Sequence, residues 1–254
     1  MRPIWMVWPE INWLSRASVL LNVYWKDLVA TETTVKQDCH SSINVRQAPT
    51  DAANQGQRII VAMTLLIRNE EDIIEDNILF HYAQGVDVFV IMDNLSTDRT
   101  KDIVLNLSKE ISIDYIYQSK DDYSQGQWVT SMARKAKVDY NADWVINSDA
   151  DEFWAAANGN TLKEALRGIS RDCTALLIDR HNAILERRAN IFAGLSAHPQ
   201  SSLAFERRSR NALGKPLPSK CLHRGSDDVI VHQGNHCVDG IGGEIKSTTD
   251  IRIF

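Results

Sequence analysis

Two aspartates separated by one residue, Asp149 and Asp151, follow the apolar segment 144–146. In extended backbone, alternate side chains point to the same side, so both carboxylates can bind one hard cation such as Mg²⁺ or Mn²⁺. The spacing alone is weak evidence, because chance produces roughly two such triplets in a chain of this composition. The ordinary alternative is a solvated acidic turn. Glu152, the next acid, either supports the ligands or begins a helix.

Polar residues also follow two earlier apolar segments. Residues 59–67 lead into the sequence RNE at 68–70, and residues 86–92 lead into the sequence DNLSTD at 93–98. Parallel sheets bind their ligands beyond the carboxyl ends of the strands. Acid-rich ends on three strands at one edge of a sheet therefore predict a bound cation.

The elements that must position these residues alternate between strand and helix. Patterns typical of buried strands occupy residues 59–67, 86–92, 113–117 and 144–146. Strands that alternate with helices form βαβ units. The sequence therefore predicts an α/β fold, Rossmann-like, with a mainly parallel central sheet and flanking helices.

Helical spacing of apolar residues fills the intervals between these strands. Asn69 is expected to cap the first helix, and Gly85 is expected to end it. Further helices are expected around residues 103–107 and 128–136. The sequence TLKE at 161–164 is a capping box, which predicts the start of another short helix.

Composition narrows the class of protein. The chain has 254 residues, with 28 Lys plus Arg against 33 Asp plus Glu and a net charge of −5. Nucleic-acid binding and polybasic attachment to membranes both need a basic excess, so this balance argues against both. The four cysteines are scattered without a C-x-x-C pair, which indicates reduced thiols in a cytoplasmic protein.

Residues 1–57 are a separate region. Four of the seven tryptophans lie in the first 25 residues, and residues 31–57 are polar and without periodicity. This pattern predicts a Trp-rich arm followed by a linker, ahead of a single domain at residues 58–254. The arm either packs on the domain or contacts a membrane peripherally, which would place the protein at the inner face of the membrane.

Three motifs, in this order, resemble those of the family 2 glycosyltransferases. They are IRNE at 67–70, DNLSTDRT at 93–100 and WVINSDADEF at 144–153, the last of which resembles the branch with a D-A-D-E-F strand end. The resemblance covers residues 58–254. It implies the glycosyltransferase-A fold and metal-dependent transfer of a sugar from a nucleotide-sugar donor, with inversion.

The same resemblance implies that the first two strand ends hold the nucleoside. The corresponding residues are Arg68, Asn69, Glu70, Asp93, Ser96 and Asp98.

The chemistry of a nucleotide-sugar donor also calls for a cation. The departing diphosphate gains negative charge as the glycosidic bond breaks, and Mg²⁺ or Mn²⁺ can neutralise that charge as a Lewis acid. We assign Asp151 as a metal ligand. Asp149 is expected to bind the ion through water or to hold the ribose.

A second candidate segment lies near the C-terminus. Residues 218–238 resemble the family segment that begins with K-x-x-x-R and ends in G-N-H. The resemblance implies that Lys220 and Arg224 offset diphosphate charge and that His236 completes the metal shell or contacts the diphosphate. His232 is the second choice. The ordinary alternative for each histidine is a hydrogen-bonded packing residue, although neutral imidazole is a common ligand of transition metals.

An inverting transferase needs a general base beside the acceptor hydroxyl. The candidates are Asp179, Asp227, Asp228 and Asp239, with Asp239 weakly favoured because it follows the G-N-H sequence closely. Residues 251–254 read as an unfinished strand, so we expect the chain to be C-terminally truncated relative to its family.

Three other functions share part of this pattern. A non-catalytic relative would bind nucleotide or sugar without transferring it. A nucleotidyltransferase would carry a Gly-rich phosphate loop after the first strand, and residues 68–70 have no glycine. A D-x-D phosphatase would carry its acids at the first strand rather than the fourth. The resemblance alone favours uridine diphosphate as the leaving group. The sugar and the acceptor, whether glycan, lipid or protein, stay open.

Overall fold

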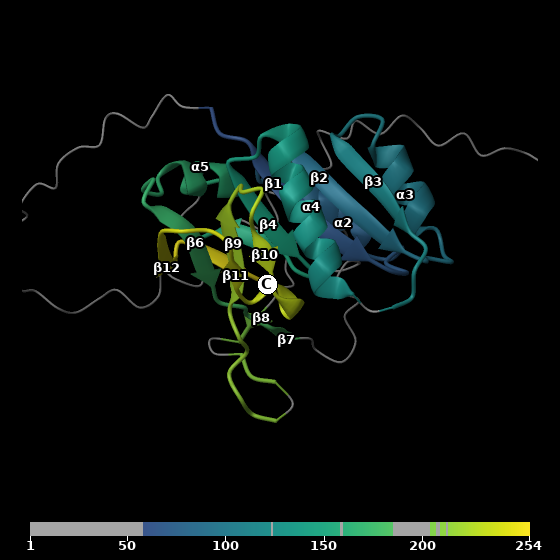
Figure 1. Ribbon diagram of the computed structural model, residues 1–254. Helices are drawn as coiled ribbons and strands as arrows, with labels where there is room; N and C mark the ends of the chain where they lie inside the picture. The colour runs from purple at the N-terminus through teal and green to yellow at the C-terminus, as the bar shows by residue number, and fades with distance from the viewer. Residues whose placement is uncertain (1–57, 123, 158–159, 185–203, 207–208, 212) are drawn as a thin grey trace, which may run out of the picture.

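The computed structural model describes residues 58–254 except 123, 158–159, 185–203, 207–208 and 212 (Figure 1). The Trp-rich arm and linker expected at residues 1–57 lie outside the described residues. None of the helices in the described part is long and apolar enough to cross a membrane.

Helices and strands alternate through the first half of the described chain (Figure 1). The helices are α2 (Ile74–Ala83), α3 (Thr100–Leu107), α4 (Gln125–Tyr140) and α5 (Leu162–Arg167), with a short 3-10 helix η1 (Gln233–Asn235). The strands are β1 (Val61–Ile67), β2 (Val88–Asn94), β3 (Ile113–Gln118), β4 (Trp144–Ser148), β5 (Trp154–Ala156), β6 (Cys173–Ile178), β7 (Ala183–Ile184), β8 (Ala204–Phe205), β9 (Lys220–Arg224), β10 (Ile230–Val231), β11 (Val238–Asp239), β12 (Glu244–Ser247) and β13 (Ile251–Ile253).

Seven of the described strands form one central sheet in the order β12-β6-β9-β4-β1-β2-β3. Neighbouring strands are parallel except at β9, which runs antiparallel to both β4 and β6. The remaining described strands pair two by two, β10 with β11, β13 with β5 and β7 with β8. The expected fold class, an α/β fold with a mainly parallel sheet and flanking helices, is confirmed.

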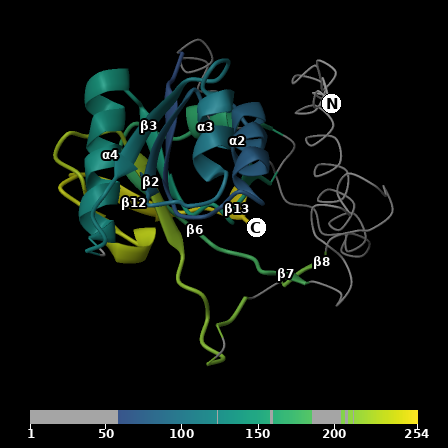
Figure 2. The same ribbon diagram turned by 90° about the vertical axis from the view of Figure 1, so that its right-hand side faces the viewer.

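Helices cover both faces of the sheet. Figure 2 shows α4 on one face and α2 with α3 on the other. Ile78 of α2 belongs to the same buried cluster as Phe89 of β2, and Met132 of α4 belongs to a second cluster with Val90 of β2. Because the central strands are buried on both faces, their sequences are nearly continuous apolar runs.

The expected local elements are largely present. β1, β2, β3 and β4 lie at the four expected strands, and their ends differ from the expected ones by at most two residues. Gly85 follows the end of α2 with a φ of 92°, and the N–H of Val86 donates to the carbonyl of His81. The capping box is formed as well, with the N–H of Thr161 donating to the carboxylate of Glu164 at 2.8 Å.

The expected helix cap at Asn69 is wrong. α2 begins at Ile74, and Asn69 lies in the left-handed region with a φ of 58°. Its side-chain oxygen accepts a hydrogen bond from the N–H of Thr97 at 2.8 Å. The amide therefore joins two neighbouring loops, and a tight turn at Glu70 separates it from the helix.

The parallel strands β1, β2, β4 and β6 all end at one edge of the sheet, which we call the carboxyl edge. Helices α2 and α3 connect β1, β2 and β3 on one face, and α4 returns to β4 over the other face, so the connections diverge between β1 and β4. Such a switch point is the usual place for a ligand in an open α/β sheet. The antiparallel strand β9 starts at this edge with Lys220 and ends at the opposite edge with Arg224, which pairs with Trp144.

Candidate active site

The loops after β1 and β2 are joined to each other at the carboxyl edge. Ser96 Oγ accepts a hydrogen bond from the N–H of Asn69 at 2.9 Å. Arg68 extends from the same loop to an ion pair with Asp121 at 2.8 Å, in which both side chains are about half exposed. The structure thus places Ser96 against the loop that carries Arg68, Asn69 and Glu70, and the contact of these residues with a nucleoside stays a prediction.

The other two residues expected at a nucleoside, Asp93 and Asp98, support these loops from within. Asp93 is only 1% exposed, and its two oxygens accept from the N–H of Ser96 at 2.9 Å and from the Tyr115 hydroxyl at 2.7 Å. The Asp98 carboxylate accepts from the N–H groups of Thr100 and Glu71. Both carboxylates are therefore used by the protein itself, and their contact with a nucleoside stays a prediction.

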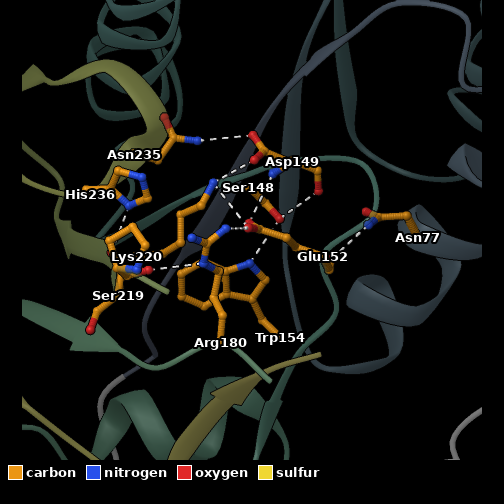
Figure 3. A network of polar contacts seen from close by, with 11 residues as sticks. Asn77, Ser148, Asp149, Glu152, Trp154, Arg180, Ser219, Lys220, Asn235 and His236 are labelled. Atoms are coloured by element: carbon orange, nitrogen blue, oxygen red, sulfur yellow. Dashed lines mark hydrogen bonds and ion pairs between the residues drawn. The ribbon is translucent and has the colours of Figure 1, made fainter. Parts of the chain in front are cut away.

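A buried lysine holds the acids that follow β4. Lys220 Nζ lies 2.6 Å from Asp149 Oδ2 and 3.1 Å from Glu152 Oε1 (Figure 3), and its side chain is 1% exposed. Arg180 Nη1 lies 3.7 Å from the same Glu152 oxygen. A lysine this deeply buried is normally paired, and here two carboxylates share it. The partners of Lys220 in this structure are carboxylates, and its contact with a diphosphate stays a prediction.

Glu152 is the buried member of this group, with a side chain 8% exposed. Burial raises the pKa of Glu152 to about 7, and the opposing charge of Lys220 offsets this only in part. Its Oε2 accepts from the N–H of Asp149 at 3.3 Å. The strand β5 follows it rather than a helix, so Glu152 supports the turn that carries Asp149 and Asp151.

The Gly-Asn-His sequence reaches the same place through its asparagine. Asn235 is 2% exposed, has a φ of 60°, and places Nδ2 3.5 Å from Asp149 Oδ1. His236 Nδ1 lies 2.9 Å from the Ser219 carbonyl oxygen (Figure 3). Because a carbonyl only accepts, Nδ1 carries a proton and donates to it, so Nε2 is the ring nitrogen left for a ligand.

Negative charge collects at the carboxyl edge, which suits a divalent cation. Burial raises the pKa of Glu70 above its usual value, and the negative charges of Asp151, Asp72, Asp98 and Asp149 raise it further. Oxygen donors of this kind are those that Mg²⁺ and Mn²⁺ prefer, so the donor chemistry fits such an ion.

The expected metal ligands are not gathered around one point, however. Within the described residues, no three His, Cys, Asp or Glu side chains are grouped closely enough to hold a metal. Asp149, Asp151 and His236 therefore do not form the predicted triad, because Asp149 is turned towards Lys220 and His236 towards Ser219.

The candidate general bases are spread over the molecule. Asp179 follows β6 at the carboxyl edge, where its Oδ1 accepts from the Ser219 hydroxyl at 2.9 Å. Asp239 pairs with His232 Nε2 at 2.7 Å on the β10–β11 strand pair and is 69% exposed. Asp227 and Asp228 follow the end of β9 and thus lie towards the opposite edge of the sheet. This placement favours Asp179.

Arg224 does not join the site, which corrects the prediction that it offsets diphosphate charge. Four residues along an antiparallel strand from Lys220, it lies at the opposite edge of the sheet. Its guanidinium stacks 3.9 Å from the centre of the Trp144 ring and donates to the carbonyls of Cys173 and Ile169. There it also borders a cavity of about 250 Å³, which Asp143 and Arg171 line as well and which does not include the acids that follow β4.

Sequence reasoning missed two residues of α2 that contact the acidic turn. Asn77 Nδ2 donates to the backbone carbonyls of Ala150 and Glu152, and His81 Nε2 accepts from the N–H of Trp154. The available signal was their i, i+4 spacing, which puts two polar side chains on the buried face of a helix.

No protein-family model and no curated protein matches the sequence. Among solved structures, TarS residues 1–349 from S. aureus is 19% identical over 66% of this chain and 47% of its own, with a TM-score of 0.44. The same protein in complex with UDP is 21% identical over 48% of this chain and 36% of its own, with a TM-score of 0.40.

A second solved protein is glucosyl-3-phosphoglycerate synthase from Mycobacterium tuberculosis, in complex with Mn²⁺, UDP and phosphoglyceric acid. It is 15% identical over 68% of this chain and 57% of its own, with a TM-score of 0.38. This chain therefore spans between 36% and 57% of the length of these structures. At such identities and TM-scores the likeness assigns no role to any residue of this chain.

Proposed function

We propose that the chain is a metal-dependent glycosyltransferase that takes a sugar from a nucleotide-sugar donor bound at the carboxyl edge. The observation that carries this proposal is the buried cation Lys220, paired with Asp149 at the switch point of the sheet, where the charges of Asp149 and Asp151 also raise the pKa of Glu70. This mixture of oxygen donors and positive charge suits a divalent cation together with a diphosphate.

Each side chain receives a role from its surroundings. Asp151 is exposed and is the proposed metal ligand, with Glu70 beside it. His236, whose Nδ1 is held by the Ser219 carbonyl, would contact the ion or the diphosphate through Nε2. Asp149, held by Lys220 and Asn235, orients the donor and contacts its ribose. A bound Mg²⁺ or Mn²⁺ ion would supply Lewis-acid stabilisation of the departing diphosphate.

Asp179 is the proposed general base, and Asp239 is the second choice. The hydrogen bond from Ser219 fixes one oxygen of Asp179, which leaves the other to accept the proton of an acceptor hydroxyl. Attack of that hydroxyl on the face opposite the leaving group gives inversion.

The test is calorimetric titration of uridine, guanosine and thymidine diphosphates, each with and without Mn²⁺. We expect one nucleotide, with uridine diphosphate the first choice, to bind in a metal-dependent way. Asp151→Ala should weaken this binding at least about tenfold because it removes a metal ligand. The matched control is Asp172→Ala, an exposed carboxylate just before β6 at the opposite edge, which should bind as the wild type does.

Failure of every nucleotide to bind the folded protein would overturn the proposal. A second measurement separates an enzyme from a non-catalytic relative. Release of nucleoside diphosphate from nucleotide-sugars should be detectable in the wild type, and Asp179→Asn should lose it while still binding the nucleotide.

A further inference from the structure

The acidic turn after β4 is attached to α2 by buried hydrogen bonds. Asn77 Nδ2 donates to the carbonyl of Ala150 at 2.8 Å and to that of Glu152 at 2.9 Å. Four residues later on the same helix, His81 Nε2 accepts from the N–H of Trp154 at 3.0 Å. The helix thus holds the backbone at residues 150, 152 and 154. Residue 150 lies between Asp149 and Asp151, and residue 152 follows Asp151 directly.

The two side chains also fix each other. His81 Nδ1 lies 2.8 Å from the Asn77 carbonyl and 3.1 Å from Asn77 Oδ1, so this nitrogen carries the proton. Nε2 is then the acceptor that the N–H of Trp154 requires. Both side chains are completely buried, and a buried amide or imidazole with all its hydrogen bonds made has one orientation.

Aromatic packing and a hydrogen bond close the far end of the turn. The His81 ring stacks on Phe153 with centroids 6.0 Å apart, and Phe80 meets Phe153 edge-on at 5.3 Å. Trp154 Nε1 donates to Ser148 Oγ at 2.9 Å, which ties the first residue of β5 to the last residue of β4 (Figure 3).

We propose that Asn77 and His81 are positioning residues, which hold the turn from Asp149 to Trp154 so that its carboxylates keep the geometry needed to bind a metal ion and a nucleotide. This inference rests on the proposed function for its binding readout. Groups that orient metal ligands without touching the ion commonly change metal affinity by 10- to 100-fold.

The test compares two substitutions of one residue. His81→Gln keeps an acceptor for the N–H of Trp154, whereas His81→Phe keeps the ring and its stacking but has no acceptor. We expect Mn²⁺-dependent affinity for uridine diphosphate to fall by at least about tenfold in His81→Phe and to stay within about threefold of the wild type in His81→Gln. Hydrogen exchange of the Trp154 amide should accelerate in His81→Phe but not in His81→Gln.

Two further variants separate positioning from general loss of stability. Asn77→Leu removes the side-chain amide that donates to the turn, and it should show the same loss of affinity and the same faster exchange as His81→Phe. It also provides the test if His81→Phe does not fold. Val104→Ala, a buried truncation in α3, should lower stability while leaving the affinity and the exchange of the Trp154 amide unchanged.

Unchanged affinity in folded His81→Phe and Asn77→Leu would overturn the inference, even if the Trp154 amide exchanged faster. An equal loss of affinity in Val104→Ala would overturn it too. If the wild type binds no nucleotide with Mn²⁺, the proposed function fails. In that case the exchange measurement alone decides whether α2 holds the turn.

Discussion

At the scale of single residues, pairing decides which carboxylates are available to a ligand. Lys220 holds Asp149 and Glu152, and loop N–H groups occupy Asp93 and Asp98. Asp151 is exposed and, among the described residues, has no hydrogen-bond or ion-pair partner. The second acid of the D-x-D sequence is therefore the one best placed to meet an ion from solvent.

Lys220→Met tests the importance of this pairing for stability. Removing one partner of a buried ion pair typically costs about 3–5 kcal/mol, and we expect a loss of that order at neutral pH in the free energy of unfolding measured with urea. The double variant Lys220→Met/Glu152→Gln should recover part of the loss, because the buried carboxylate is no longer left unpaired. Equal stability of the single and double variants would contradict this explanation.

His81 predicts a loss of stability in acid. Burial lowers the pKa of His81 from 6.5 to about 3, so the folded chain keeps the ring neutral where the unfolded chain protonates it. This contribution to stability is complete above pH 6.5 and is lost as the pH falls from 6.5 towards 3. Between pH 7 and about pH 4.5 the wild type should lose about 2–3 kcal/mol more than His81→Gln in urea unfolding. Parallel pH profiles would count against a neutral, buried His81.

At the scale of elements, short connections determine where the side chains of the site can reach. Gly85 follows the end of α2 and lies close to α5, which begins with a capping box. A Cβ added at position 85 would lie 2.7 Å from Lys163 Cβ. The start of α5 therefore fits against the end of α2 only because position 85 has no side chain.

Gly85→Ala should destabilise the fold. The residue has a φ of 92°, and a non-glycine residue held in such a conformation costs about 1–3 kcal/mol before any contact with Lys163 is counted. Chemical denaturation should show this loss. The control is Gly242→Ala, where no atom lies within 4 Å of the added Cβ and the φ is not positive. We expect that control to change stability by less than about 0.5 kcal/mol, and a similar effect of both substitutions would refute the argument.

At the scale of the whole molecule, one sheet edge collects residues that are far apart in the chain. Glu70, Asp149, Asp179, Lys220 and Asn235 lie there because the parallel strands of the central sheet end, and the antiparallel strand β9 begins, at the same edge. Two buried clusters, one on each face of the sheet, hold this arrangement.

These clusters predict that residues 58–254 fold as a unit. Their described members extend from Ile59 near the start of β1 to Ile253 in β13, so apolar burial links the whole of this region. A protein of residues 58–254 alone should unfold in one cooperative transition, with a midpoint close to that of the full chain. Circular dichroism during heating would measure this. A broad, non-cooperative transition would contradict the predicted domain boundary.

Much of the fold could be read from the sequence, because its signals are local. Four apolar runs, helical spacing between them, Gly85 and the capping box at Thr161 each report on neighbouring residues only. The cap expected at Asn69 failed because its side chain bonds to Thr97, 28 residues away, which local propensity does not register. The second half of the described chain was harder, because its strands are short and β9 reverses direction within the sheet.

The sequence by itself determined the α/β class and the acids at three strand ends, since hydrophobic periodicity and residue type suffice for both. Only the tertiary structure decided which of these acids are already paired, and that Arg224 is at the far edge while Asn77, His81 and Asn235 support the site. The physical reason is that pairing and burial depend on contacts between residues distant in the chain. Such contacts arise when the sheet assembles, and the spacing of residues along the chain does not encode them directly.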